Sequence, residues 1–238
     1  MTRPTSAEKA AALYDRGYAE KYRAHDDTLA TSGPYLGFVA WLQRVCDEFR
    51  APIDVLELGC GTGRYFSALK GARSIVGIDA SSDMLALAKK PYRAESITAE
   101  RITLIQGDIF THPLEEAAFD LAYSIGVLAE HAPLNREIAI RVHRVLRPEG
   151  RFAFSTVHPD SPSIGASLGR AVARTIAPFL PGPLRRRVRE RLMSGGMYAD
   201  ETRIQEVLSP MFAIESLERF VSEAHLHCLC VARKRVTQ

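Results

Sequence analysis

The fold is decided by the stretch Val55-Leu56-Glu57-Leu58-Gly59-Cys60-Gly61-Thr62-Gly63-Arg64. An apolar run leads directly into three glycines at alternate positions, which predicts a buried strand followed by a tight loop. Glycine lets the backbone turn sharply and lets a ligand approach where a Cβ atom would collide. A helix expected over residues 62–70 would present its unpaired amides to the same ligand. The stretch therefore predicts a nucleotide-binding loop.

The spacing of the glycines separates classes of nucleotide. Dinucleotide-binding loops read G-x-G-x-x-G, and their third glycine allows close packing of helix and strand. Here Arg64 takes that third position, and the glycine falls one residue earlier, at Gly63. A second buried strand, residues 74–79, ends in Asp79, roughly 20 residues after the first glycine, where a ribose-binding acid belongs. Such an acid serves any ligand that contains adenosine.

These two motifs resemble the signature of class I S-adenosylmethionine-dependent methyltransferases. The motifs are Glu-Leu-Gly-Cys-Gly-Thr-Gly at 57–63 and Gly-Ile-Asp-Ala-Ser-x-x-Met-Leu at 77–85, and the resemblance runs from about Tyr14 to the last strand. It implies an α/β, Rossmann-like fold: a doubly wound, seven-stranded, mostly parallel sheet with an antiparallel hairpin at its C-terminal end. It also implies S-adenosylmethionine as the cofactor and S-adenosylhomocysteine as the product.

Length and composition fit one such domain. The chain has 238 residues and is 46% apolar, which suffices for one core. Its net charge of +3 is too small to indicate nucleic-acid binding by itself. The four cysteines lack C-x-x-C spacing, so we expect reduced, structural thiols and no metal site. No apolar run has the character of a signal peptide or of a membrane helix, so we expect a cytoplasmic protein with no membrane or nucleic-acid partner.

We expect a single domain in four parts. Residues 1–50 form an N-terminal helical cap, 51–157 the cofactor-binding core, 158–200 a lid-like insertion for substrate, and 201–238 the last helix and terminal strands. The insertion is predicted because the alternation of strands and helices lapses there over an unusual length. Within it, the arginines of 184–192 fit a solvated helix face, a site for an acidic or phosphorylated substrate, or a nucleic-acid patch.

The cofactor contacts follow from the resemblance. Thr5-Ser6-Ala7-Glu8 has the pattern of a capping box, and the helix that it opens, expected to run to about Ala24, would close over the cofactor. Glu57 would organise the methionine end, Asp108 would bind adenine, and residues 124–128 would border the methionine moiety. The full predicted set is Tyr14, Tyr22, Glu57, Gly59, Cys60, Gly61, Gly63, Asp79, Ala80, Met84, Asp108, Ile109 and Ser124. Ordinary packing is the alternative for the two tyrosines and Met84, and a simple Asp turn for Asp108.

Two histidines are candidates for the acceptor side. His131 follows the strand expected at 119–124, and His158 follows the strand expected at 151–157. Ligands of open α/β sheets bind at the carboxyl ends of strands, and histidine is the usual general base near neutral pH. A structural role is the alternative for both. The predicted substrate-lining residues are Trp41, His131, His158 and Tyr198, with plain core packing as the alternative for Trp41.

The sequence identifies the methyl donor better than the acceptor. The N-terminal helices and the insertion favour a small organic acceptor, with an oxygen, nitrogen or carbon nucleophile. An RNA or protein methyltransferase is an alternative, although the Asn/Asp-Pro-Pro-Tyr motif of many such enzymes is absent after the fourth strand. A non-catalytic S-adenosylmethionine-binding protein is another, whereas Arg64 disfavours a nicotinamide oxidoreductase. The sequence specifies neither the acceptor nor the oligomeric state.

Overall fold

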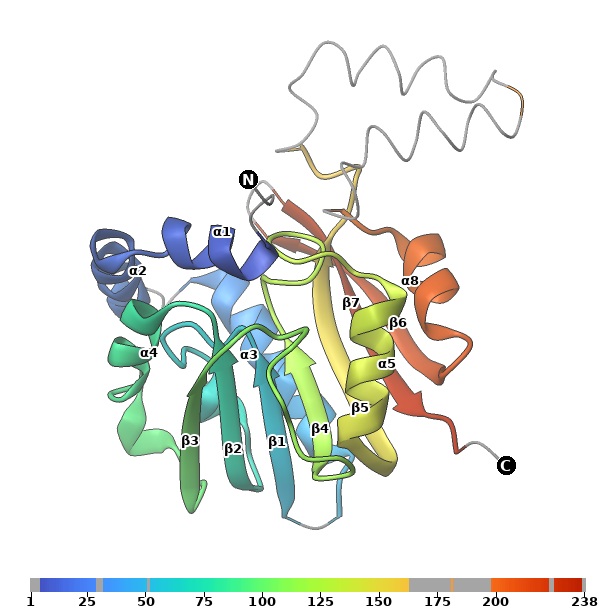
Figure 1. Cartoon of the computed structure of the whole chain (residues 1–238), viewed down its shortest axis with the longest axis horizontal. Helices are drawn as coiled ribbons and strands as arrows, with labels where there is room; N and C mark the ends of the chain where they lie inside the picture. The colour runs from blue at the N-terminus through green and yellow to red at the C-terminus, as the bar shows by residue number, and fades with distance from the viewer. Residues whose placement is uncertain are drawn as a thin grey trace.

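The computed structural model describes residues 5–28, 32–50, 52–162, 181, 198–222 and 225–236. Within them, seven strands form one sheet in the order β3-β2-β1-β4-β5-β7-β6 (Figure 1). The strands are β1 Ile53–Leu58, β2 Ala72–Asp79, β3 Arg101–Gln106, β4 Phe119–Ser124, β5 Leu146–Val157, β6 Phe212–Ser222 and β7 His225–Lys234. The first five pair in parallel, and β7 pairs antiparallel with β5 and β6. This topology confirms the predicted fold class.

Helices cover both faces of the sheet, and one lies across the carboxyl ends of its strands. In Figure 1, α5 and α8 lie on one face, α3 lies on the other, and α1 crosses the carboxyl ends of the strands. The helices are α1 Ser6–Leu13, α2 Arg16–Thr28, α3 Gly33–Asp47, α4 Ser82–Ala88, α5 Arg136–Val145 and α8 Glu201–Leu208, with short 3₁₀ turns η2 Phe66–Ala68 and η3 Ala94–Ser96. None of these described helices combines the length and the apolar character needed to cross a membrane.

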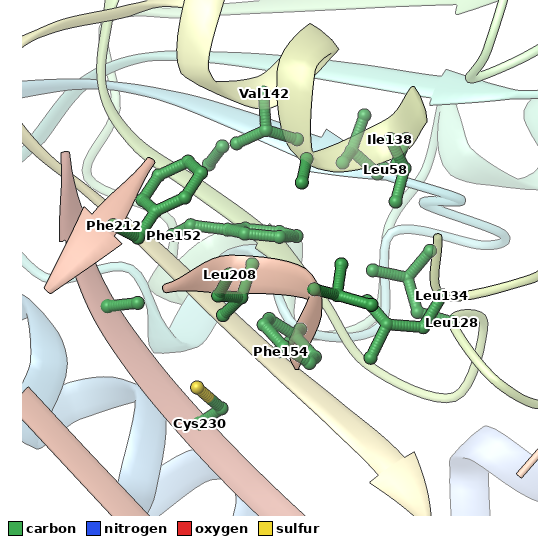
Figure 2. Packing of buried hydrophobic residues seen from close by; sticks show 14 of the residues in the cluster. Leu58, Leu128, Leu134, Ile138, Val142, Phe152, Phe154, Leu208, Phe212 and Cys230 are labelled. Atoms are coloured by element: carbon green, nitrogen blue, oxygen red, sulfur yellow. The ribbon is translucent and has the colours of Figure 1, made fainter. Parts of the chain in front are cut away.

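The sheet is held between two apolar clusters. All six residues of β1 are buried, as expected for a parallel strand covered on both faces. Figure 2 shows Ile138 and Val142 of α5 facing Phe152 of β5, within the cluster on the α5 side. Trp41 belongs to the second cluster, on the α3 side. This packing fixes the strand ends from which the site is built.

The predicted helix over residues 62–70 is wrong. Gly63 has φ +71°, in the left-handed region, so a right-handed helix cannot begin before it. The chain then follows tight i→i+3 bonds, such as those from the Phe66 amide to the Gly63 carbonyl oxygen and from the Leu69 amide to the Phe66 carbonyl oxygen. Only the 3₁₀ turn η2 results.

Other boundaries also differ from those predicted. The capping box at Thr5 and Glu8 is confirmed, but the N-terminal helix ends at Leu13 and a second one begins at Arg16. The break occurs because Asp15 Oδ1 accepts the Tyr18 amide at 2.9 Å and so caps the new helix. The Asn135 side chain accepts the Ile138 amide and caps α5, which begins at Arg136.

The predicted insertion lies mainly outside the described residues. Of the range 158–200, the structure describes 158–162, 181 and 198–200, so the arginine-rich stretch 184–192 is not among them. The helix predicted after Asp200 is confirmed as α8, and the Asp200 side chain accepts the Arg203 amide. The division of the chain into four parts stays a prediction.

Candidate cofactor-binding site

A cavity lies at the carboxyl ends of β1, β2 and β4, next to α1. This is where the strand order reverses, since β1 lies between β2 and β4 in the sheet. The following predicted site residues line the cavity: Tyr14, Tyr22, Gly59, Gly61, Asp79, Ala80, Met84, Asp108, Ile109 and His131. Residues separated by more than a hundred positions in the sequence thus share one wall.

The glycine loop folds back onto the end of β2. The amides of Gly59 and Cys60 both donate to the Ile78 carbonyl oxygen, at 2.8 and 3.1 Å. Gly59 has φ +77°, and a Cβ atom there would lie 2.5 Å from Val127 Cγ2. Glycine is therefore required at this position both for the backbone conformation and for the approach of the loop after β4.

Asp79 is fixed by backbone amides at the cavity wall. Its Oδ2 accepts the Gly61 amide at 2.8 Å, and its Oδ1 accepts the Ser81 amide at 2.9 Å. Burial raises the pKa of Asp79, which these hydrogen bonds oppose. Each carboxylate oxygen keeps a second lone pair, so the group can still accept ligand hydroxyls.

Asp108 forms an Asp turn at the cavity wall. Its Oδ1 accepts the Phe110 amide at 2.8 Å, which forms the Asp turn. The residue also lines the cavity together with Ile109. The turn therefore holds the carboxylate at the cavity wall.

Tyr14 joins the N-terminal helices to both sides of the cavity. Its hydroxyl lies 2.7 Å from His131 Nε2, and its carbonyl oxygen accepts the Ser81 hydroxyl at 2.6 Å. Burial raises the pKa of Tyr14 and lowers the pKa of His131. Both groups are therefore neutral near neutral pH, and the tyrosine hydroxyl donates to the imidazole.

The loop after β4 is tightly folded and anchored in the core. The Val127 carbonyl oxygen accepts the amides of Glu130, His131 and Ala132, and Ala129 adopts φ +59°. Glu130 Oε1 is buried and has no hydrogen-bond partner among the described residues. Burial raises the pKa of Glu130 to about 7. The sequence analysis missed Glu130. Its burial depends on the fold of this loop, and the sequence does not predict the left-handed conformation of Ala129.

Several predicted cofactor residues support the cavity without lining it. Glu57 is buried, Tyr123 Oη donates to its Oε2 at 2.5 Å, and burial raises its pKa well above the usual range. Ser124 Oγ donates to the Leu58 carbonyl oxygen at 2.9 Å, which ties β4 to β1. Cys60 is buried, and Gly63 packs against Phe66. The cavity lining contains none of these four predicted residues.

His158 lies in a buried polar cluster away from the cavity lining. Its Nδ1 accepts the Asp160 amide at 3.0 Å, and its Nε2 lies 3.3 Å from Glu201 Oε2. Arg219 Nε donates to the other oxygen of Glu201 at 2.5 Å. Ligand atoms of His158, Glu201 and Cys228 lie within 4.8 Å of one another. Because Nδ1 accepts a hydrogen bond, the neutral ring carries its proton on Nε2, which leaves no lone pair there for a metal.

The other predicted acceptor residues are also separate from the cavity. Trp41 is buried and lines a different groove, with Arg151 and Glu218, on the α3 side of the sheet. Tyr198 is partly buried, next to Ala199, whose amide donates to the Val157 carbonyl oxygen. His158, Trp41 and Tyr198 stay predictions for the acceptor side.

The cavity lining also includes residues with small or apolar side chains. Within the predicted 124–128 border, the structure brings Ile125, Gly126 and Val127 to the cavity. Sequence reasoning missed Ala7, Ala10, Gly107, Phe110 and Ala132. Ala7 and Ala10 lie three residues apart and therefore share one face of α1. This spacing could have predicted that both small side chains face the same surface.

Residues 56–154 match the family model described as "Methyltransferase domain". The chain is similar to the malonyl-[acyl-carrier protein] O-methyltransferase of Pectobacterium atrosepticum, with 29% identity over 64% of this chain and 52% of that protein. It is also similar to the demethylmenaquinone methyltransferase of Lactobacillus johnsonii, with 32% identity over 46% of each chain. The chain spans about half the length, or less, of the first curated relatives that it matches, from 39% to 52%.

The fold is similar to that of solved methyltransferases. The magnesium protoporphyrin IX methyltransferase of Synechocystis, solved with bound S-adenosylhomocysteine, has a TM-score of 0.58 and 18% identity. That similarity covers 99% of this chain and 90% of the solved one. At this identity the likeness concerns the fold alone.

Proposed function

We propose that this chain is a class I S-adenosylmethionine-dependent methyltransferase that transfers a methyl group from S-adenosylmethionine to a small organic acceptor. The observation that carries the proposal is the convergence of Asp79, Asp108 and the glycine loop on one cavity at the switch point of the sheet. The relatives named above are methyltransferases of malonyl-[acyl-carrier protein] and demethylmenaquinone, which supports an organic acceptor.

Several features of the cavity suit the cofactor. Gly126 has φ +73° and lines the cavity, and a Cβ atom there would meet nothing within 4 Å, so the backbone leaves room for a ligand. Met84 and Ile109 offer apolar surface suited to a flat purine. Buried next to the loop, Arg64 Nη2 lacks a hydrogen-bond partner within the described residues, which suits a ligand with an anionic group.

We assign roles to the residues as follows. Asp79 accepts the ribose hydroxyls, Asp108 and Ile109 hold the adenine, and the glycine loop with Glu57 behind it holds the methionine end. When bound, S-adenosylmethionine supplies an electrophilic methyl group on a sulfonium. α1, fastened through Tyr14, covers the cavity and excludes water, so the chain contributes mainly orientation in a dry site.

His131 is the proposed base for an acceptor that must lose a proton. It lines the cavity and is neutral near neutral pH, because burial lowers its pKa. Its Nε2 accepts the Tyr14 hydroxyl, so proton uptake at that atom requires the tyrosine to turn away first. An amine or carbon acceptor in its neutral nucleophilic form would not need this step.

The test uses S-adenosylmethionine that carries an isotope-labelled methyl group. The purified protein is incubated with small-molecule, total-RNA and total-protein fractions of a bacterial extract, and each fraction is examined by mass spectrometry. We expect a labelled methyl group on a compound of the small-molecule fraction, absent with the Asp79→Ala variant. Label confined to RNA or protein would favour macromolecular methylation, and cofactor binding without transfer in any fraction would favour a non-catalytic protein.

A further inference from the structure

The turn that follows β3 forms the cavity wall at Asp108. The Asp108 carbonyl oxygen accepts the amides of Thr111 and His112, at 3.2 and 2.9 Å, and its Oδ1 accepts the Phe110 amide at 2.8 Å. Phe110 lines the cavity together with Asp108. Because these bonds join residues 108–112 to one another, the place of the carboxylate depends on the place of the whole turn.

His112 fixes this turn at its far end. Its imidazole packs over Gly107, which lines the cavity, so that a Cβ atom at Gly107 would lie 2.7 Å from His112 Nδ1. The His112 carbonyl oxygen accepts a hydrogen bond from Arg141 Nη2 of α5. A hydrogen bond from a charged donor is stronger than one between neutral groups. Arg141 therefore fastens the turn to a helix that packs on the sheet.

Arg141 also interacts with Asp108 by charge. Burial lowers the pKa of Arg141, and the Asp108 carboxylate counteracts this by favouring the charged form. Arg141 Nε is buried and has no hydrogen-bond partner among the described residues, which costs stability. A methionine of similar length would avoid this cost, so packing alone does not favour an arginine at this position.

We propose that Arg141 is a positioning residue for the adenine of the methyl donor: it holds the turn after β3 so that the Asp108 carboxylate faces the adenine amino group. The inference rests on the proposed function and adds to it a residue that is absent from the cavity lining. Arg141 acts through His112 and Asp108 and touches no ligand. Without it, the turn keeps its internal hydrogen bonds but loses its bond to α5, so the carboxylate is less well preorganised for the base.

The test compares S-adenosylhomocysteine with S-inosylhomocysteine, in which a carbonyl oxygen replaces the adenine amino group. A carboxylate accepts a hydrogen bond from the amino group and repels the carbonyl oxygen. Isothermal titration calorimetry measures the dissociation constants of both ligands for the wild type and for Arg141→Met. We expect the wild type to bind S-adenosylhomocysteine about tenfold or more tightly than the inosine analogue. In Arg141→Met this preference should shrink to about threefold or less.

Arg144→Met is the matched control, because Arg144 belongs to the same helix but is 64% exposed and pairs with Glu116 at the surface. It should keep the wild-type preference for adenine. Arg141→Lys should keep most of it, since an ammonium group can donate to the same carbonyl oxygen. If Arg141→Met does not fold, Arg141→Leu replaces it with the same expected loss of preference.

An unchanged preference after the loss of Arg141, including an equal fall in affinity for the two ligands, would overturn the inference while leaving the proposed function intact. Equal affinity of the wild type for the two ligands would overturn it as well, because Asp108 would then not distinguish the amino group. If the wild type binds neither ligand, the inference and the proposed function fall together.

Discussion

Two pairs of histidine and glutamate lie near the carboxyl ends of neighbouring strands, and their surroundings differ. After β4, His131 lines the cavity, while the adjacent Glu130 has a buried Oε1 without a partner in the described chain. After β5, His158 lies against Glu201, which is paired with an arginine. His131 lies at the cavity with its Nε2 hydrogen-bonded to Tyr14, whereas His158 lies against Glu201, which is paired with Arg219.

The two carboxyl groups show the same contrast in their pKa values. Burial raises the pKa of Glu130 to about 7, whereas the hydrogen bond from Arg219 lowers the pKa of Glu201 to about 2. A strand-end position alone therefore does not make a residue functional. A neighbouring cation lowers the pKa of a carboxyl group, whereas burial without one raises it.

The largest expected effect comes from a substitution that displaces the loop after β4. Gly59→Ala places a Cβ atom 2.5 Å from Val127 Cγ2, which pushes this loop out of position. We expect the affinity for S-adenosylhomocysteine, measured by calorimetry, to fall about a hundredfold or more, equivalent to about 3 kcal/mol.

Gly71→Ala is the control for backbone strain. Gly71 has φ +74°, but a Cβ atom there meets nothing within 4 Å. This variant should lose about 1 kcal/mol of unfolding free energy and keep its affinity for the ligand. Equal affinities in the two variants would show that the contact with Val127 does not shape the cavity.

The second prediction concerns His158. His158→Ala removes the acceptor for the Asp160 amide and leaves Glu201 without the imidazole beside it, so unfolding free energy should fall by about 2–3 kcal/mol. Affinity for S-adenosylhomocysteine should change by less than about twofold. Urea denaturation and calorimetry measure the two quantities. A stable variant with lost methyl transfer would instead place His158 in the acceptor site.

The third prediction tests the two carboxyl groups by pH. The pKa of Glu130 is raised on folding from the ordinary 4.5 to about 7, so its contribution to stability is present below 4.5 and lost as pH rises through 7. Glu130→Gln should therefore be more stable than the wild type at pH 8, by about 2 kcal/mol, and not at pH 4.5.

Glu201 provides the opposite case. Its pKa is lowered on folding to about 2, so its contribution is present above 4.5 and lost as pH falls towards 2. Glu201→Gln should lose stability at neutral pH and show a flatter acid profile. Urea denaturation at several pH values measures the free energy of unfolding of both variants and the wild type. If this free energy changed with pH in the same way for Glu130→Gln and the wild type, the raised pKa of Glu130 would be contradicted.

The smallest expected effect concerns the fastening of α1. Tyr14→Phe keeps the ring but removes the hydroxyl that donates to His131. We expect S-adenosylhomocysteine to dissociate about threefold to tenfold faster, as for the loss of one neutral hydrogen bond. Stopped-flow fluorescence measures the rate, and Tyr18→Phe, at a residue 40% exposed, is the control. Equal rates in the two variants would show that this bond does not hold α1 over the ligand.

The local parts of the site were predictable from the sequence. Gly59 follows β1, Asp79 is the last residue of β2, and Asp108 comes shortly after β3. Because a parallel sheet brings the carboxyl ends of its strands together, these positions in the sequence predicted a shared site. The seven-stranded, mostly parallel sheet and its terminal hairpin followed from the resemblance, whereas the order of the strands comes from the structure.

What could not be predicted depends on contacts between distant positions. Arg64 is fixed by Asp26, which lies 38 positions earlier, and with that anchor and a left-handed Gly63 the expected helix over 62–70 does not form. The environment of His158 is made by Glu201 and Arg219, which follow far later in the chain. Glu130 is buried by the folding of its own loop around the Val127 carbonyl oxygen, which no periodicity encodes.

The central claim is that the cavity beside α1 holds the adenosine of the methyl donor, and a crystal structure of the protein grown with S-adenosylhomocysteine tests it most directly. We predict ligand density with its ribose on Asp79 and its adenine beside Asp108. Density for the ligand at another place, or a cavity that stays without it at saturating concentration, would contradict the account.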